Sequence, residues 1–355
     1  MSQAKILKFD PLNPSEDYLQ EAGDVLRDGG LVIIPTETVY GIAANLLNKK
    51  TIEKLYEIKK RPKDKPFSLI IGKKEDIEAY AQNIPVAAYK LADKFWPGPL
   101  TLILQGKDNQ TVGLRMPDNP VALRLISLTG LPIACPSANL SGEPAAVDFQ
   151  EAIKGFGGLV DLAIDAGRTK LAAESSIVDL TLEPLKVIRE KALKKELIEA
   201  VAGKKIVLFV CTGNSCRSVM AQYLLQKKLR QKKRDDVEVL SAGIIMAAGL
   251  GASDATKEIL RAEGIDASGH RSQQVTGEMI KKSDLILVME KLHEERLLQI
   301  APEAKNRVFL LKEFAKINDS DLDLDISDPI GRPADFYEET FQVIKAAIER
   351  IAQII

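Results

Sequence analysis

The chain has 355 residues, and its 49 lysines and arginines almost balance its 50 aspartates and glutamates, so the net charge is −1. This balance argues against nonspecific coating of nucleic acid, and no apolar stretch approaches the ~20 residues that span a membrane. Three cysteines without a signal-peptide pattern predict a reducing, cytoplasmic setting. The two histidines, His270 and His293, lie in charged segments and are predicted to be solvated, so a metal site built from histidine is not expected.

The length predicts two domains, each large enough for its own core. Residues 191–205 are rich in Lys, Ala and Glu and contain no aromatic residue, so the boundary is placed there. We therefore expect domains at 1–195 and 205–355, with a linker over 196–204. The composition of that linker favours a helix.

The first half mixes helical and strand patterns. A helix over 15–27 ends at a Gly-Gly pair, a buried strand follows at 31–34, and a second helix over 51–60 ends before a proline. Further strands are predicted at 67–71, 100–104, 132–135 and 177–180. This mixture predicts an α/β domain with a mixed, twisted sheet.

The second half alternates regularly between apolar runs and helical patterns, which is typical of a doubly wound parallel sheet. Four strands are predicted, at 206–210, 237–240, 285–289 and 308–311. In the last helix, apolar side chains recur at spacings of four and three from Tyr337 to Ile355, so this face is expected to pack on the sheet. Ligands of such sheets bind beyond the carboxyl ends of the strands, which is where Cys211 falls.

The loop after the first of these strands has the composition of a phosphate cradle. It reads Cys-Thr-Gly-Asn-Ser-Cys-Arg over 211–217, and Ser218 follows in a predicted helix start. Backbone N–H groups of such a loop converge on an anion, and the helix N-terminus adds positive potential. Arg217 would bind two phosphoryl oxygens, and the same field favours a nucleophilic thiolate at Cys211. The alternative is a buried Cys at a strand end, followed by an ordinary turn.

Together with three further segments, this loop resembles the low-molecular-weight protein-tyrosine-phosphatase family over about 204–355. The segments are Ser-Ala-Gly at 241–243, Gly-His-Arg-Ser at 269–272 and Asp-Pro at 328–329. The resemblance implies that Cys211 attacks phosphorus to form a phosphocysteine while Arg217 and the loop amides hold the equatorial oxygens. Asp328 would protonate the leaving group and later help to activate water.

The remaining members of the expected phosphate loop are Thr212, Gly213, Asn214, Ser215, Cys216 and Ser218. Ser218 is expected to donate to the thiolate and Asn214 to fix the loop, the alternatives being a polar helix start and a turn former. Cys216 either pairs with Cys211 on oxidation or packs in the core. No cysteine follows it, which argues against the relay that arsenate reduction needs.

The phosphatase substrate is left open between two classes. Tyrosine-directed members usually carry a branched aliphatic residue where this chain has Ser215, whereas the protein-arginine-phosphatase branch carries a small hydroxyl residue. Phosphotyrosine and phosphoarginine in a phosphoprotein therefore both remain candidates.

The first half contains neither a G-x-x-x-x-G-K-[ST] loop nor a G-x-G-x-x-G turn, so a nucleotide would be bound by side-chain cations. Candidate cations cluster in KKRPKDKP at 59–66. Other notable segments are GLVIIPTETVYG at 30–41, WPGPLTLIL at 96–104, GLRMP at 113–117, PSANLSG at 136–142 and SSIVDL at 175–180. Taken in order, these segments resemble the threonylcarbamoyl-AMP synthase family (YrdC-type domain) over about 5–195.

That resemblance implies condensation of L-threonine, bicarbonate and ATP into threonylcarbamoyl-AMP and pyrophosphate, and a separate transferase complex would use the product to modify tRNA. Lys59 and Arg61 would hold the triphosphate with Mg²⁺. Ser137 and Asn139 would bind phosphate or ribose, and Arg189 could reach the nucleotide. The threonine side would be formed by Thr36, Tyr40, Arg115 and Ser175. No nucleophile stands out, so catalysis would rest on orientation and charge neutralisation.

Two positions depart from this family's pattern. The usual Arg-Pro-Gly near the domain end is Arg-Glu-Lys here, at 189–191, and the His that many members carry after K-x-R-P is replaced around Phe67 and Ser68. The leading hypothesis is a bifunctional enzyme. The alternative is a first half that binds RNA or nucleotide without catalysis, fused to an active phosphatase.

Overall fold

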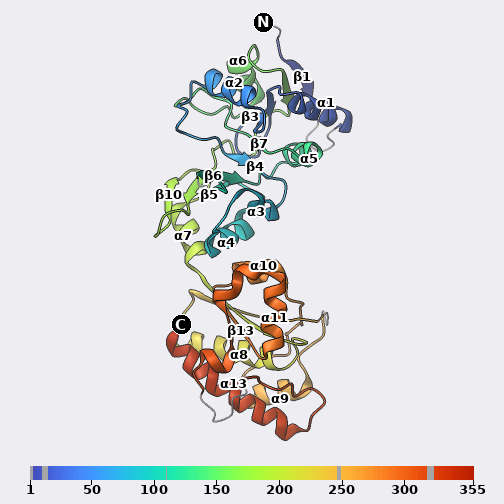
Figure 1. Cartoon of the computed structure of the whole chain (residues 1–355), viewed down its shortest axis with the longest axis vertical. Helices are drawn as coiled ribbons and strands as arrows, with labels where there is room; N and C mark the ends of the chain where they lie inside the picture. The colour runs from blue at the N-terminus through green and yellow to red at the C-terminus, as the bar shows by residue number, and fades with distance from the viewer. Residues whose placement is uncertain (1–2, 10–14, 109, 246–248, 318–323) are drawn as a thin grey trace. The chain divides into compact units, whose positions relative to one another are not determined.

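The computed structural model describes residues 3–9, 15–108, 110–245, 249–317 and 324–355 (Figure 1). The chain divides into two compact units, Met1–Ala202 and Gly203–Ile355. None of the helices in the described ranges is long and apolar enough to cross a membrane.

The first unit is built on one mixed sheet, with strand order β1-β8-β2-β3-β7-β4-β6-β5-β9-β10 among the described residues. Its strands are β1 Lys5–Lys8, β2 Val32–Ile34, β3 Gly41–Asn45, β4 Leu69–Ile70, β5 Leu100–Gln105, β6 Thr111–Arg115, β7 Ile133–Ala134, β8 Leu162–Asp165, β9 Ser176–Asp179 and β10 Lys186–Arg189. Neighbours are parallel in β1–β8, β8–β2, β4–β6 and β5–β9, and antiparallel in the other pairs. The predicted mixed α/β sheet is confirmed.

The helices of this unit cover both faces of the sheet. They are α1 Glu16–Arg27, α2 Lys49–Lys59, α3 Ile77–Tyr80, α4 Val86–Phe95, α5 Pro120–Thr129, α6 Phe149–Phe156 and α7 Lys195–Gly203, with a 3₁₀ turn at Lys74–Asp76. Strand β2 shows the division of the core, because Val32 and Ile34 pack with α1 and α5 whereas Ile33 joins the larger cluster on the opposite face.

Local sequence sets where several of these helices begin and end. The side chain of Asn48 accepts from Thr51 N at the start of α2, and that of Asn119 caps α5 just before a proline at the first helical position. Helix α5 ends at Gly130 in the left-handed region (φ 62°), where glycine carries no Cβ penalty.

The second unit is a four-stranded, all-parallel sheet of order β12-β11-β13-β14 within the described ranges. Its strands are β11 Lys205–Cys211, β12 Val237–Gly243, β13 Leu285–Val288 and β14 Val308–Leu310. Its helices are α8 Arg217–Gln231, α9 Asp254–Ala262, α10 Gly277–Lys282, α11 Lys291–Ile300, α12 Leu311–Phe314 and α13 Ala334–Ile354, with a 3₁₀ segment at Pro302–Arg307. The predicted doubly wound sheet is confirmed.

Two apolar clusters, one on each face, hold the helices of the second unit to the sheet. Helices α8, α9 and α13 share one cluster with Phe209 of β11, while Leu208 and Val210 of the same strand pack with α10 and α11. The predicted apolar stripe of α13 is buried from Tyr337 to Ile351, as expected for a face packed on the core. Burying each large side chain of this kind is worth about 1.5–3 kcal/mol.

Candidate active sites

The phosphate-loop sequence lies where the central strand β11 ends and α8 begins. Cys211 is the last residue of the strand and is 2 % exposed, and its Sγ lies 3.0 Å from Ser218 Oγ in the first turn of the helix. The neighbouring strand β12 ends at Gly243, where a Cβ would stand 2.7 Å from the Thr212 carbonyl oxygen. The Ser-Ala-Gly motif therefore ends in glycine because the loop passes directly against it.

Asn214 holds the loop in shape from inside the protein. It is fully buried with φ of 52°, a left-handed conformation that asparagine tolerates better than most residues. Its Nδ2 donates to Ser218 Oγ (3.0 Å) and Ser241 Oγ (2.7 Å), and its Oδ1 accepts from Gln273 N. Because Ser218 accepts from Asn214, its own hydroxyl proton is left to donate to the Cys211 sulfur.

The prediction that both histidines are solvated is wrong. His270 is 7 % exposed, and its Nε2 lies 2.8 Å from the carbonyl oxygen of Asn214. His293 is fully buried against the other side of the loop, with Nε2 3.0 Å from Thr212 Oγ1. Burial lowers the pKa of His270, and burial together with Arg217 lowers the pKa of His293 to about 4. The charged residues beside both histidines in the sequence are largely exposed, whereas the two imidazoles contact polar atoms of the phosphate loop.

Arg217 gathers the rest of this site around a buried guanidinium that is 1 % exposed. Nη2 donates to Asp328 Oδ2 (2.5 Å) and to Thr212 Oγ1 (3.1 Å). Nη1 donates to the Glu290 carboxylate and to the Ile326 carbonyl oxygen. The structure thus brings Asp328 to the loop from 111 residues away, which the sequence alone could not do. No residue of the described ranges offers an acceptor to Nε.

The other loop residues surround this arrangement. Cys216 is 3 % exposed, with Sγ 3.3 Å from Ser253 Oγ and 3.7 Å from Tyr337 OH. Both Cys211 and Cys216 are free thiols in this structure. Ser215 is half-buried, and its carbonyl oxygen accepts from Ser253 N at the start of α9.

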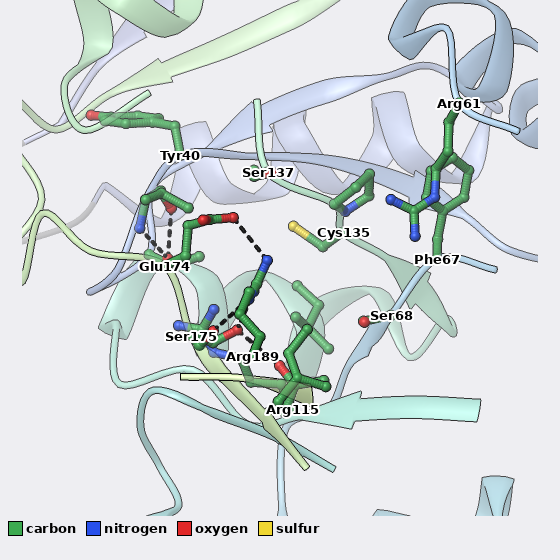
Figure 2. A pocket seen from close by; sticks show the side chains of 17 residues that line it. Tyr40, Arg61, Phe67, Ser68, Arg115, Cys135, Ser137, Glu174, Ser175 and Arg189 are labelled. Carbon is green, nitrogen blue, oxygen red and sulfur yellow. Dashed lines mark hydrogen bonds and ion pairs between the residues drawn. The ribbon is translucent and has the colours of Figure 1, made fainter. Parts of the chain in front are cut away.

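The second candidate site is a pocket of the first unit, with a cavity of about 120 Å³ (Figure 2). Of the residues predicted for nucleotide or threonine, all except Lys59 and Asn139 line it. The lining residues are Thr36, Val39, Tyr40, Gly41, Arg61, Phe67, Ser68, Ile70, Thr101, Arg115, Cys135, Pro136, Ser137, Glu174, Ser175, Ile177 and Arg189. Three arginines thus converge from separate parts of the chain onto a small, polar cavity.

Arg189 and Arg115 are each held by several acceptors. Arg189 donates through Nη1 to Glu174 Oε1 (2.8 Å), through Nη2 to Ser175 Oγ (3.1 Å) and through Nε to the Ser175 carbonyl oxygen (2.9 Å). Arg115 donates through Nη2 to Glu37 Oε1 (2.7 Å) and Thr38 Oγ1, and through Nε to the Gly98 carbonyl oxygen. These contacts hold both guanidinium groups in place within the pocket.

Arg61 stands over the ring of Phe67, with its guanidinium carbon 5.2 Å from the ring centroid. Its Nε and Nη2 donate to the carbonyl oxygens of Lys65 and Pro66. Phe67, one of the two residues found in place of the usual histidine, therefore supports an arginine of the pocket. Burial lowers the pKa of Arg61 and of Arg189 from their usual value.

Lys59 does not line the pocket. It is 2 % exposed, and its Nζ donates to the carbonyl oxygens of Ser137 and Asn139 (2.5 and 2.6 Å), while its own carbonyl oxygen accepts from Ser141 N. Ser137 reaches the pocket, but Asn139 lies along a separate hollow with Leu140 and Glu143. In this structure Lys59 fastens the end of α2 to the 136–142 loop.

Tyr40 and Thr36 have internal partners as well. The Tyr40 hydroxyl donates to the Gly167 carbonyl oxygen (2.8 Å) and accepts from Ala166 N, and Figure 2 shows the ring directed away from the three arginines. Burial raises the pKa of Tyr40 to about 12. Thr36 Oγ1 donates to the Val39 carbonyl oxygen (2.6 Å) and so shapes the polar loop after β2.

Sequence reasoning did not predict Glu174, Ser68 and Thr101 as pocket residues, nor Glu290 and Gln273 as partners of Arg217 and Asn214 in the phosphate loop. Glu174 directly precedes the SSIVDL segment, and this adjacency was a usable signal. Glu290 follows β13 by two residues, at the carboxyl edge of the parallel sheet where ligand-site residues gather. Ser68 and Thr101 lie at positions that the motifs had already singled out, and Gln273 directly follows the Gly-His-Arg-Ser segment, so these three were also within reach of the sequence.

Both units are similar to known proteins. Residues 24–191 match the Sua5/YciO/YrdC family model, described as telomere recombination, and residues 206–355 match the low molecular weight phosphotyrosine protein phosphatase model. A putative threonylcarbamoyl-AMP synthase of Mycobacterium tuberculosis is 36 % identical over 203 residues, which are 55 % of this chain and 93 % of that protein. A protein-arginine-phosphatase of Geobacillus stearothermophilus is 40 % identical over 147 residues, or 41 % of this chain and 93 % of that protein. The chain belongs to both families, one in each unit.

Both are families of enzymes. The threonylcarbamoyl-AMP synthase of Pyrococcus abyssi is 41 % identical over 192 residues, covering 52 % of this chain and 56 % of that protein. The Bacillus subtilis synthase is covered to 59 %, so the chain spans less than two thirds of these two relatives. A crystal structure of Pyrococcus abyssi Sua5 with L-threonine superposes with a TM-score of 0.54 and 27 % identity, covering 86 % of this chain and 99 % of that one.

A first prediction follows from the buried hydrogen bonds of Asn214 in the second unit. Asn214→Ala leaves the partners of Nδ2 and Oδ1 unsatisfied and places Ala at positive φ, so we expect a loss of about 2–4 kcal/mol in local stability. Hydrolysis of p-nitrophenyl phosphate should fall at least about tenfold, the equivalent of 1.4 kcal/mol. Hydrogen exchange of β11 would report the stability loss. The exposed control Asn306→Ala should match wild type, and an active, protected Asn214→Ala variant would contradict this account.

The synthase unit should show a pH dependence that comes from Lys59. Burial and the nearby Arg61 lower the pKa of Lys59 from 10.5 to about 8. Between these two values the unfolded chain holds a proton that the folded chain lacks, so the free energy of unfolding should rise with pH. We expect that rise, measured by urea unfolding followed through the single tryptophan, Trp96, to be larger in wild type than in Lys59→Met.

The difference between the two proteins is the informative quantity, because Cys135 and Tyr40 titrate in both. The exposed control Lys63→Met should behave as wild type. Parallel pH profiles for wild type and Lys59→Met would show that Lys59 keeps an ordinary pKa.

Proposed function

We propose that the first unit condenses L-threonine, bicarbonate and ATP into threonylcarbamoyl-AMP and pyrophosphate, for use in tRNA modification. The observation that carries this proposal is the convergence of Arg61, Arg115 and Arg189 on one pocket, together with Ser137 and Ser175. Three fixed cations suit the phosphates of ATP and a carboxylate substrate, and hydroxyl groups beside them suit a small polar amino acid.

The pocket favours Mg²⁺ that arrives with ATP over a metal held by the protein alone. Glu174 is the one carboxylate among the lining residues, and it is already paired with Arg189. Mg²⁺ commonly keeps several waters and is bound through one or two carboxylates plus substrate phosphates. The arginines would then share the remaining phosphate charge with the metal.

At the two positions that depart from the family pattern, residues of this chain still line the pocket. Arg189 is present and lines the cavity even though Glu and Lys follow it, and Phe67 supports Arg61. The position of Lys59 differs from the expectation, because its ammonium group binds two carbonyl oxygens of the 136–142 loop. We propose that Lys59 contributes by holding Ser137 in place.

The synthase proposal predicts pyrophosphate release that requires threonine, bicarbonate, Mg²⁺ and ATP together. Arg115→Gln should lower kcat/KM at least about tenfold, since one charge-assisted contact is worth about 1.5–3 kcal/mol. The exposed control Arg168→Gln should leave the rate unchanged. Salt-dependent binding of RNA without any threonine-dependent turnover would instead support a first unit that binds but does not catalyse.

We propose that the second unit hydrolyses protein phosphoarginine through a phosphocysteine on Cys211. Arg217, the loop amides and the start of α8 would hold the phosphoryl group, and its oxygens would supply the acceptor that Arg217 Nε lacks among the described residues. Asp328, bonded to the same guanidinium, is placed to protonate the leaving nitrogen and then to accept a proton from the attacking water.

Two observations favour phosphoarginine over phosphotyrosine. The relative that is 40 % identical over nearly its full length is a protein-arginine-phosphatase. Ser215 is small and polar at a loop position where tyrosine-directed members usually carry a branched aliphatic residue, so the loop offers a hydroxyl group instead of an apolar contact.

A matched pair of peptides, one carrying phosphoarginine and one phosphotyrosine, tests this choice. We expect kcat/KM to be at least about tenfold higher for the phosphoarginine peptide, equivalent to 1.4 kcal/mol of discrimination. Cys211→Ser should abolish release of phosphate from both peptides. An equal or reversed preference would contradict the choice of phosphoarginine over phosphotyrosine. Activity retained in Cys211→Ser would contradict a phosphocysteine intermediate.

A further inference from the structure

The side chains of Thr212 and His293 form a hydrogen-bond chain that the proposed mechanism does not yet use. Glu290 N–H donates to His293 Nδ1 (3.1 Å), so Nδ1 must carry a lone pair and not a proton. His293 is fully buried and neutral, with its pKa lowered to about 4, so its one proton lies on Nε2. His293 Nε2 therefore donates to Thr212 Oγ1, which is 3.0 Å away.

Thr212 Oγ1 has a second donor as well. Arg217 Nη2 lies 3.1 Å from it, and a guanidinium nitrogen can only donate. A hydroxyl oxygen has two lone pairs and one proton. Both lone pairs of Thr212 Oγ1 are thus occupied, and its own proton is the one hydrogen-bonding group left over. Within the described ranges, Thr212 Oγ1 has no hydrogen-bond partner besides these two donors.

The position of the Thr212 hydroxyl indicates which acceptor its unused proton could reach. Thr212 directly follows Cys211 and is half-buried, and it shares Arg217 Nη2 with Asp328 Oδ2. Its oxygen therefore stands beside the guanidinium that would hold the phosphoryl group and beside the carboxyl group that would protonate the leaving nitrogen. An anionic oxygen bound by Arg217 is the acceptor that such a donor fits.

We propose that Thr212 donates a hydrogen bond to the phosphoryl group held by Arg217, and that His293 is a positioning residue acting through Thr212. By occupying a lone pair of Thr212 Oγ1, the imidazole prevents the hydroxyl from turning its proton away from the ligand. This inference rests on the proposed phosphatase function, and it adds a donor to the amides and guanidinium of the loop.

The test compares Thr212→Val, which keeps the shape but removes the hydroxyl, with Thr212→Ser, which keeps the hydroxyl. Hydrolysis of p-nitrophenyl phosphate and inhibition by orthovanadate are measured in the full chain. We expect Thr212→Val to lose about 10- to 100-fold in kcat/KM and to bind vanadate more weakly, because a hydrogen bond to a charged group is lost. Thr212→Ser should retain most of both.

His293 is tested by His293→Leu, which removes the donor, and His293→Gln, whose amide nitrogen can replace Nε2. We expect His293→Leu to lose activity and His293→Gln to recover much of it. The double variant Thr212→Val/His293→Leu should be no slower than Thr212→Val alone, because His293 acts only through that hydroxyl.

Three results would overturn the inference while leaving the phosphatase proposal standing: Thr212→Val as active as wild type, Thr212→Ser as impaired as Thr212→Val, or losses in the double variant that multiply. If His293→Leu does not fold, the Thr212 pair and His293→Gln still decide. A wild-type chain that hydrolyses neither p-nitrophenyl phosphate nor phosphopeptides would instead refute the proposed function itself.

Discussion

The buried guanidinium of Arg217 is the interaction on which the second unit depends. A charge that is withdrawn from water needs several partners, and here a hydroxyl, two carboxylates and a main-chain carbonyl provide them. These partners come from three segments: residue 212 of the phosphate loop, residue 290 after β13, and residues 326 and 328 before α13. One cation thus holds the nucleophile loop close to the candidate acid.

In the first unit, several cations lie close together around a cavity and also need fixed partners. Its three pocket arginines are anchored by carboxylates, hydroxyls or main-chain carbonyls, so their mutual repulsion is opposed by fixed partners. Glu37 pairs with Arg115 and Glu174 pairs with Arg189, so these two carboxylates neutralise part of the charge. Such an array is prepared for an anionic ligand and costs little further ordering when one binds.

The four parallel strands of the second fold were all predicted, because three of them consist almost entirely of apolar residues and β12 contains Val-Glu-Val-Leu. The sequence predicted less of the first fold. Strand β3 is Gly-Ile-Ala-Ala-Asn, whose small residues give little strand signal, and β10 is a half-exposed edge strand. β1, β6 and β8 were also not predicted, since their pairing is decided by segments that are distant in the sequence or by packing that the pattern does not show.

For the two candidate sites as well, the sequence predicted some features and not others. Motifs located the residues that touch a pocket or loop, since those lie on short ordered segments such as 136–142 and 211–218. They could not show that Lys59 would turn toward main-chain carbonyls, or that His293 would be buried, because both outcomes depend on side-chain direction within a packed core. The charged surroundings of His293 suggested a solvated side chain, and the family resemblance suggested a triphosphate ligand for Lys59. Tertiary packing gives both side chains internal partners instead.

The surroundings of Cys135 affect how its thiol reacts with chemical reagents. Its sulfur lies against Gly41, where a Cβ would come within 2.5 Å, and loss of hydration raises the pKa of the thiol to about 12. Electrophiles react with thiolates, so the raised pKa slows alkylation of this sulfur at neutral pH even though it is half-buried and lines the pocket. Alkylation of the native protein should therefore mark Cys135 more slowly than a cysteine with an ordinary pKa.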